Sequence, residues 1–216
     1  MNLTEKYPYI VIEGPIGCGK TTLARRLAER FPVNLLLENA SANPFLPRFY
    51  HDAQRYALPT QLFFLFQRTE QISELSQRDL FGGATIADFF LEKDTLFARL
   101  NLSDDEFSLY RQIYQHLQLQ TTAPDLVIYL QTPVDTLLKR VEQRNIGYEQ
   151  TISREYLRRL AEAYGEFFHH YEAAPLLIVN NENLDCATDE AALELLLGRI
   201  GAMRSRREYF NPRLDG

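Results

Sequence analysis

The chain has 216 residues, of which 45% are hydrophobic and 24% are charged, and its formal net charge is −6. This length and composition are typical of one soluble globular domain with a substantial core. The acidic balance does not favour non-specific binding of nucleic acid, and no apolar run reaches the 18 residues of a membrane span. Two cysteines without metal-ligand spacing, and a start unlike a secretory signal, predict a cytoplasmic protein.

A phosphate-binding motif follows the first predicted strand, Tyr9 to Ile12. Gly14-Pro15-Ile16-Gly17-Cys18-Gly19-Lys20-Thr21 matches the pattern G-x-x-x-x-G-K-[ST], and a helical pattern comes next. Glycines let backbone N–H groups turn towards phosphate oxygens, and the positive end of the helix points the same way. Lys20 can reach the β- and γ-phosphates, and Thr21 can offer its hydroxyl to Mg²⁺. We therefore predict that residues 14–22, including Thr22, bind a nucleoside triphosphate.

The first helix, Lys20 to about Arg30, is followed by a strand from Val33 to Leu37 that ends at Glu38. An acid at the carboxyl end of a strand faces the ligand crevice of an open α/β sheet, although a solvated loop acid explains it equally well. Residues 43–57 predict a short helix and a loop, and Pro59 begins a long helix. On that helix Gln61 and Arg68 share one face, which suits a planar heteroaromatic ligand. Ordinary surface side chains are the competing interpretation.

The third predicted strand, Ala84 to Ala87, ends in Asp88. A carboxylate at this place is typical of the acid that holds Mg²⁺ beside a phosphate loop. A helical stretch over 89–102 comes next. Ser103 with Glu106 forms a capping box that begins a helix from Asp104 to about Leu119. Strand four is predicted over residues 126–130, and a helix that starts with Thr132 as its cap and Pro133 in its first position follows.

That helix carries Arg140 and Arg144 and ends at a breaker, Asn145-Ile146-Gly147. An arginine pair before a glycine-containing loop is typical of a mobile lid over an anion, here about residues 140–152. A solvated basic helix end is the alternative. Ser153 begins a helix over about 154–171 with Glu155 in its first turn. Strand five over 176–179 and a last helix from about residue 188 follow, and residues 204–216 predict a mobile tail.

Five strands that alternate with helices predict one α/β domain over residues 1–203. We expect a P-loop kinase fold, in which a five-stranded parallel sheet is flanked by helices on both faces and carries a lid. The residues singled out above should then meet at the carboxyl ends of the strands.

From about residue 7 to 183 the chain resembles the deoxynucleoside kinases, in the branch of deoxycytidine, deoxyadenosine and deoxyguanosine kinases. The phosphate loop alone is shared by many kinases and NTPases. The more specific resemblance is a spaced set of residues: Glu38, the segment FYHDAQRYALPTQ, Gln61 with Arg68, Asp88 with Asp94, Arg140 with Arg144, and Glu155.

This resemblance implies a homodimer that uses ATP and Mg²⁺ to phosphorylate the 5′-hydroxyl of a 2′-deoxynucleoside. It implies that Lys20, Arg140 and Arg144 stabilise the transferring phosphoryl group and that Thr21 and Asp88 hold the metal. The acceptor would be bound by these residues: Glu38, which takes the hydroxyl proton; Gln61 at the base edge; Arg68 and Asp94 near the base; and Tyr50 and Glu155 at the 3′-hydroxyl. The Arg68–Asp94 pair favours cytosine or purines over thymine, and we lean slightly to purines.

Two departures from the family pattern stand out. The arginine that usually follows the acid after strand three is Phe89 here, and we hypothesise that Lys93 or a lid arginine supplies its charge. The chain has no tryptophan, so an aromatic wall must come from residues such as Phe45, Phe49 or Phe64. Two other functions remain open: a nucleoside monophosphate kinase, whose second phosphate Arg48, Arg55 or Arg68 could bind, and a catalytically weak nucleotide-binding module.

Overall fold

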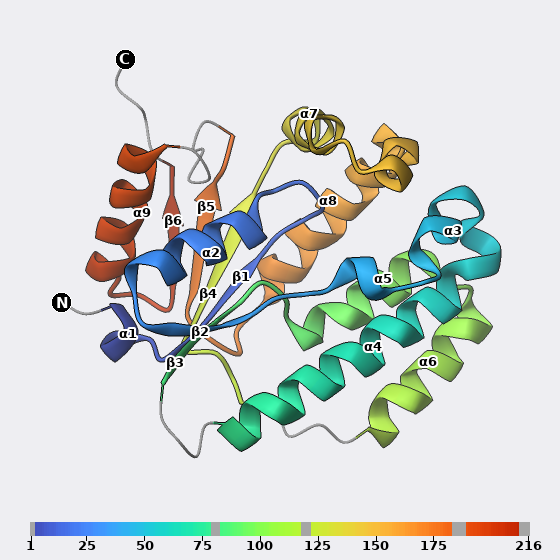
Figure 1. The fold of residues 1–216 in the computed structure, drawn as a ribbon, viewed down its shortest axis with the longest axis horizontal. Helices are drawn as coiled ribbons and strands as arrows, with labels where there is room; N and C mark the ends of the chain where they lie inside the picture. The colour runs from blue at the N-terminus through green and yellow to red at the C-terminus, as the bar shows by residue number, and fades with distance from the viewer. Residues whose placement is uncertain (1–2, 79–82, 118–121, 183–188, 212–216) are drawn as a thin grey trace.

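The computed structural model describes residues 3–78, 83–117, 122–182 and 189–211. Within these ranges six strands form one sheet in the order β2-β3-β1-β4-β5-β6, and every neighbouring pair is parallel (Figure 1). The strands are β1 (Tyr9–Glu13), β2 (Val33–Leu36), β3 (Ala84–Ala87), β4 (Leu126–Gln131), β5 (Leu176–Asn180) and β6 (Arg207–Phe210). None of the helices in these ranges combines the length and apolar character needed to cross a bilayer.

Helices cover both faces of the sheet. Alternate residues of β1 point to opposite faces: Ile10 and Ile12 pack with α1, α2, α7 and α9, whereas Val11 packs with α8. The helices are α1 (Leu3–Lys6), α2 (Lys20–Arg30), η1 (Ala40–Ala42), α3 (Leu46–His51), α4 (Ala53–Arg78), η3 (Leu91–Lys93), α5 (Asp94–Asn101), α6 (Asp104–His116), α7 (Val134–Arg144), η4 (Gly147–Thr151), α8 (Arg154–His170) and α9 (Glu190–Ala202). This is the doubly wound arrangement that the alternation of strands and helices predicted.

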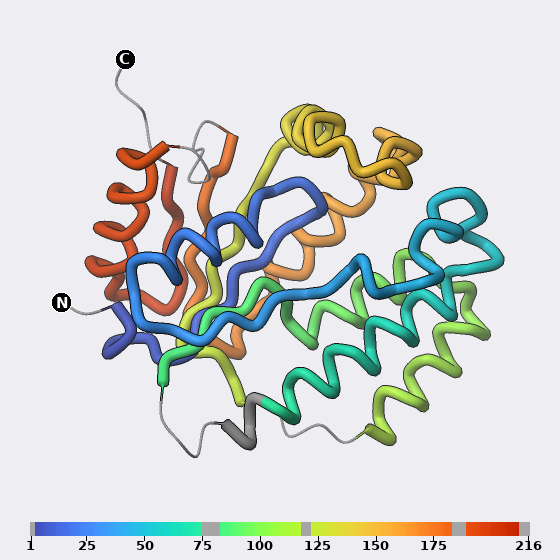
Figure 2. The backbone as a smooth tube through the Cα atoms, in the orientation of Figure 1, coloured from blue at the N-terminus to red at the C-terminus, as the bar shows by residue number. Residues whose placement is uncertain are grey.

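A second layer of helices lies to one side of the sheet. The chain leaves β2, runs out to α3 and then returns along α4 (Figure 2). Leu65 and Ile72 of α4 pack with Ala98 of α5 and Tyr110 of α6 in a cluster of their own. Residues of α4 and the residue that follows β3 line a common cavity, so this layer forms one wall of a possible ligand site.

The residues after position 203 differ from the mobile tail that was predicted, and they change the number of strands in the sheet. Arg207–Phe210 form β6, which pairs in parallel with β5, so the sheet has six strands where five were predicted. Glu208 ties this segment together, since its carboxylate accepts the N–H groups of Arg204 and Ser205 and pairs with Arg199. Residues 212–216 of the predicted tail lie outside the described residues.

Three helix starts also differ from expectation. Helix α4 begins at Ala53, before Pro59, because the carboxylate of Asp52 accepts the N–H of Arg55 at 3.2 Å and opens the first turn. Stretch 89–102 is not one helix but splits into η3 and α5. Helix α7 begins at Val134, and the Thr132 hydroxyl hydrogen-bonds the carbonyl of Leu130 at 3.3 Å instead of capping the helix.

Three other predicted helix starts are confirmed. Helix α2 spans Lys20–Arg30 as expected, and Ser103 forms both hydrogen bonds of the capping box with Glu106. Ser153 caps α8 through the N–H of Tyr156. These starts depend on side chains close in sequence, which is why they can be predicted locally.

Candidate active site

The loop between β1 and α2 is held open by glycine. Gly17 has φ +85°, and a Cβ there would lie 2.9 Å from the carbonyl oxygen of Leu137 in α7. Gly19 has φ +94° and forms the N-cap of α2 without a side-chain hydrogen bond. The first N–H groups of α2 therefore have no side-chain cap. These groups and the positive end of the helix dipole both point into the space over the loop.

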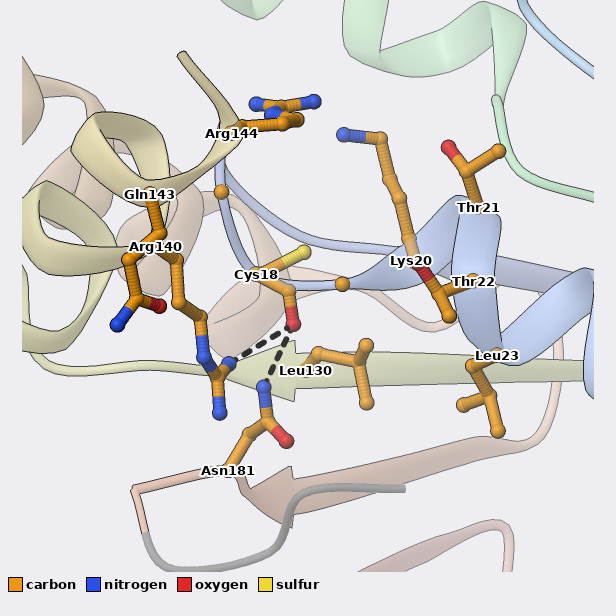
Figure 3. Close-up of a pocket in the computed structure, with 12 residues that line it drawn as sticks. Cys18, Lys20, Thr21, Thr22, Leu23, Leu130, Arg140, Gln143, Arg144 and Asn181 are labelled. Carbon is orange, nitrogen blue, oxygen red and sulfur yellow. Dashed lines mark hydrogen bonds between the residues drawn. The ribbon is translucent and has the colours of Figure 1, made fainter. Parts of the chain in front are cut away.

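A cavity of about 310 Å³, here called the loop cavity, lies over this loop. The side chains of Lys20 and Arg144 point towards each other across it (Figure 3). Arg140 lines the cavity but turns to the loop backbone, where its Nη1 donates to the Cys18 carbonyl at 3.2 Å. Asn181, at the end of β5, donates to the same carbonyl at 2.7 Å. The two side chains thus fix the loop, and Lys20 and Arg144 are the cations that face an anion placed there.

Thr21 lines the loop cavity and contacts Asp88, the residue that follows β3. The Thr21 hydroxyl donates to one carboxylate oxygen of Asp88, and the other oxygen accepts the backbone N–H of Glu38 at 2.7 Å. No cluster of three or more His, Cys, Asp or Glu side chains that could hold a metal occurs among the described residues. One hydroxyl and one carboxylate still fit Mg²⁺, which keeps waters and binds to phosphate oxygens.

A second cavity, the inner cavity, holds about 190 Å³ and adjoins the first. The two cavities share Gly17, Lys20, Thr21 and Arg144. Four of the predicted acceptor residues line the inner cavity: Glu38, Tyr50, Gln61 and Arg68. Gln61 and Arg68 are both 3% exposed, so the interpretation of these two as surface side chains is wrong.

Arg68 joins two carboxylates in this cavity. Its Nε donates to Glu38 at 2.9 Å, its Nη2 reaches the same oxygen, and its Nη1 pairs with the fully buried Asp94. Burial raises the pKa of Glu38, but the positive charges of Arg68, Lys93 and Lys20 outweigh it and lower that pKa to about 2. Glu38 is therefore ionised at neutral pH. Asp94 does not line the cavity and acts on it through Arg68.

Glu155 does not reach either cavity. Its side chain is 63% exposed and pairs with Arg158 on the outer surface of α8. The buried face of α8 is formed by Leu157, Leu160, Tyr164 and Phe168, and a residue two positions before Leu157 points away from that face. The carboxylate that does line the inner cavity is Glu149 in η4, which the sequence did not single out.

Glu149 lies beside the predicted Tyr50. It is 8% exposed, and its Oε2 is 3.0 Å from Arg144 Nη2. Burial raises the pKa of Glu149. Tyr148 stacks on Tyr50 with ring centroids 6.0 Å apart and an interplanar angle of 10°. The sequence shows that Glu149 lies shortly after Arg144, beyond the turn at Asn145. Because Glu149 is not on a predicted helix, helical periodicity could not show which way its side chain points.

The structure also places the aromatic residues expected to form a wall and the residues near the position of the absent arginine. Phe49 and Phe64 line the inner cavity, whereas Phe45 does not. Phe89 is 1% exposed and packs with Leu65 and Tyr110, away from the cavity. Lys93 lines the cavity, and so does Tyr156, which was not predicted.

Comparison with known proteins bears on the family and the fold. The model of the deoxynucleoside kinase family matches residues 10–203. The deoxyguanosine kinase of Bacillus subtilis (strain 168) is 31% identical over 198 residues, which cover 89% of this chain and 96% of that protein. The deoxyadenosine kinase of Lactobacillus acidophilus is 30% identical, with 88% and 94% covered. The solved deoxyadenosine kinase from M. mycoides with bound dCTP has the same fold, with a TM-score of 0.78 at 23% identity over 90% of this chain and 100% of that one. The chain thus belongs to the deoxynucleoside kinase family and is an enzyme that phosphorylates deoxynucleosides.

Proposed function

We propose that the enzyme transfers the γ-phosphate of ATP to the 5′-hydroxyl of a purine 2′-deoxynucleoside, as a step of nucleotide salvage. The observation that carries this proposal is that the two cavities meet at Lys20 and Thr21, with the Glu38 carboxylate on the inner side. A phosphate held by the loop and a hydroxyl held by Glu38 are then neighbours, which is the proximity that an in-line transfer needs.

Residues 14–22 form the donor site in this proposal. The N–H groups of the loop and of the first turn of α2 hold the phosphates, and Lys20 neutralises their charge. Thr21 and Asp88 are the ligands that would hold Mg²⁺. Bound there, the ion would neutralise charge on the phosphate oxygens.

In the acceptor site Glu38 orients the 5′-hydroxyl and takes its proton. A carboxylate with a pKa of about 2 is a weak base. In a loose transition state of phosphoryl transfer the hydroxyl loses its proton late, so a strong base is not required. Gln61 pairs with the edge of the base, and Arg68, held by Asp94, lies beside it. Phe49 and Phe64 form the apolar walls against which the ring packs.

We assign the 3′-hydroxyl to Tyr50 and Glu149. Glu149 takes the place in which Glu155 was expected, because it is the carboxylate that lines the inner cavity beside Tyr50. A deoxyribose hydroxyl can donate to a carboxylate and accept from a phenol, so the pair satisfies both of its hydrogen-bonding capacities.

Residues 140–152 form the lid in this proposal. Arg144 lines both cavities, so a small movement brings its guanidinium to the transferring phosphoryl group. Arg140 donates to the Cys18 carbonyl and so supports the transfer by holding the phosphate loop in place. Closure of the lid would exclude water, which otherwise competes as phosphate acceptor.

The preference for purines rests on the relatives, whose names are deoxyguanosine kinase and deoxyadenosine kinase. A third relative, from Bacillus subtilis, is named deoxyadenosine/deoxycytidine kinase, so deoxycytidine is the next candidate. A homodimer, a cytoplasmic location and the lack of nucleic-acid and membrane partners remain predictions.

A panel of four deoxynucleosides and their 5′-monophosphates, each with ATP and Mg²⁺, tests this function. We expect 5′-monophosphate and ADP as products and the highest kcat/KM for a purine deoxynucleoside. Glu38→Gln should lower kcat by about 10²- to 10⁴-fold, whereas Glu29→Gln, an exposed acid of α2, should not change it. Faster turnover of the monophosphates, or ATP binding without turnover of any nucleoside, would refute the proposal.

A further inference from the structure

A buried ion pair lies beneath the phosphate loop. Glu13, the last residue of β1, is 0% exposed, and its Oε1 is 2.8 Å from the Nζ of Lys93, which is 2% exposed. Removing two charges from water is expensive, and a pair of apolar residues would often stabilise a core as well. Stability alone therefore gives no reason for the pair, and its place beside the cavities points to a chemical role.

Glu13 is fixed from three sides. Its second carboxylate oxygen accepts the N–H of Gly14 at 2.9 Å and the hydroxyl of Tyr164 at 3.1 Å. Gly14 is the first residue of the phosphate loop, and Tyr164 is buried in α8. The carboxylate thus sets the position of Lys93 Nζ relative to the loop.

Lys93 also lines the inner cavity, and its positive charge helps to lower the pKa of the Glu38 carboxylate there. It lines that cavity together with Glu38, Asp88 and Lys20, and its Nζ lies 5.7 Å from the centroid of the Phe97 ring. In the described part of the chain its one ion-pair partner is Glu13. An ammonium group has three donor hydrogens, so donors remain for a ligand oxygen in the cavity.

The arginines of the site are engaged elsewhere. Arg68 bridges Glu38 and Asp94, Arg140 binds the Cys18 carbonyl, and Arg144 pairs with Glu149 at the rim. Arg144 would approach the transferring group from the lid, and a cation fixed on the acceptor side would complement it, because charge develops on the oxygens of that group. Lys93 is the cation whose position the fold fixes on that side.

We propose that Lys93 is a catalytic residue of the phosphoryl transfer and that Glu13 is its positioning residue. This proposal rests on the proposed function. The 5′-oxygen forms a bond to the γ-phosphorus, the bond from that phosphorus to the β–γ bridging oxygen breaks, and the hydroxyl proton goes to Glu38. Lys93 keeps its own proton and donates hydrogen bonds to the 5′-oxygen and to an oxygen of the transferring group. Its charge thereby takes the place of the arginine that Phe89 replaces.

The test removes the charge of Lys93 without leaving Glu13 charged and alone. In the double variant Glu13→Gln/Lys93→Met both charges disappear, the glutamine keeps the shape of Glu13, and the methionine keeps an unbranched chain that lacks the terminal ammonium group. We expect kcat to fall by about 10²- to 10³-fold, as for the loss of one transition-state donor. The KM values for ATP and for the deoxynucleoside should change by less than about 3-fold, because the contacts with both ground states remain.

Three further variants complete the design. Lys93→Gln keeps a donor for Glu13 and serves as the second neutral variant if the double variant melts below the assay temperature. Lys93→Arg keeps the charge and should retain more kcat than either neutral variant. Lys139→Met removes an exposed lysine of α7 and should leave kcat unchanged.

The outcomes separate this inference from the proposed function. A folded neutral variant with kcat within about 3-fold of wild type would refute the role of Lys93, while the wild-type activity would still support the proposed function. Equal losses in Lys93→Arg and Lys93→Gln would also refute it, since charge would then not matter. A wild-type enzyme inactive on every deoxynucleoside would refute both.

Discussion

The assignment of the 3′-hydroxyl to Glu149, and not to Glu155, can be tested by a matched pair of substitutions. Glu149→Gln keeps the shape of the side chain but removes its charge, and a hydrogen bond to a charged group contributes about 1.5–3 kcal/mol. We therefore expect kcat/KM to fall by about 10- to 150-fold. Glu155→Gln alters an exposed ion pair with Arg158 and should change kcat/KM by less than about 3-fold.

A substrate without the 3′-hydroxyl isolates the contact between Glu149 and that hydroxyl. Glu149 also pairs with Arg144, whose side chain is 47% exposed, so part of the loss could come from that pair. The 2′,3′-dideoxynucleoside cannot use Glu149, and on it the Glu149→Gln variant should match wild type within a few-fold. Steady-state kinetics of the wild type and Glu149→Gln on the deoxynucleoside and the dideoxynucleoside gives the coupling between Glu149 and the 3′-hydroxyl. An equal loss on both substrates, or a loss in Glu155→Gln as large as in Glu149→Gln, would refute the assignment.

Three further predictions concern charge and backbone. Burial raises the pKa of Glu149 whereas nearby cations lower that of Glu38 to about 2, so the acid limb of kcat/KM should belong to Glu149 and disappear from the pH profile of Glu149→Gln; an unchanged limb would contradict this. Arg68→Met leaves Asp94 buried and unpaired and should lower the free energy of unfolding in urea by about 3–5 kcal/mol, most of which the double variant Arg68→Met/Asp94→Asn should restore; equal losses would show that the pair is not the cause. Gly17→Ala should abolish ATP binding in calorimetry, because its Cβ would lie 2.9 Å from a carbonyl oxygen of α7 at φ +85°, and unchanged affinity would show that the loop adapts.

The helix start next to the predicted phosphate loop is the part that the sequence predicts well. It depends on residues that are close in the chain, and α2 begins at Lys20 as expected, after Gly17 and Gly19 with positive φ. Gln61 and Arg68 could also be paired from sequence, since helical geometry places residues seven apart on one face. Their burial follows from the layer of α3, α5 and α6 packed around α4, and no local pattern shows it.

Other parts of the site depend on contacts that local patterns do not contain. Glu155 lies in the first turn of α8, where the helix dipole stabilises a negative side chain. Its place in the helix therefore has a structural cause and gives no information about ligands. The sequence Glu92-Lys93-Asp94 is typical of a solvated surface, but the turn from η3 into α5 directs Lys93 and Asp94 inwards. Strand β6 is four residues long and exists because β5 offers it an edge.

The charges of the inner cavity also decide between a nucleoside and a nucleoside monophosphate as acceptor. Arg68, the arginine beside the predicted base site, is buried and already paired with Glu38 and Asp94. Arg48 and Arg55, which could have bound a second phosphate, are exposed and lie against Tyr56, outside the cavity. A monophosphate would have to compete with a buried carboxylate for its cation, and breaking a buried pair costs about 3–5 kcal/mol. A neutral deoxynucleoside does not have to break the buried pairs of Arg68 with Glu38 and Asp94, so these pairs favour it over its own product by a factor of about 100 or more.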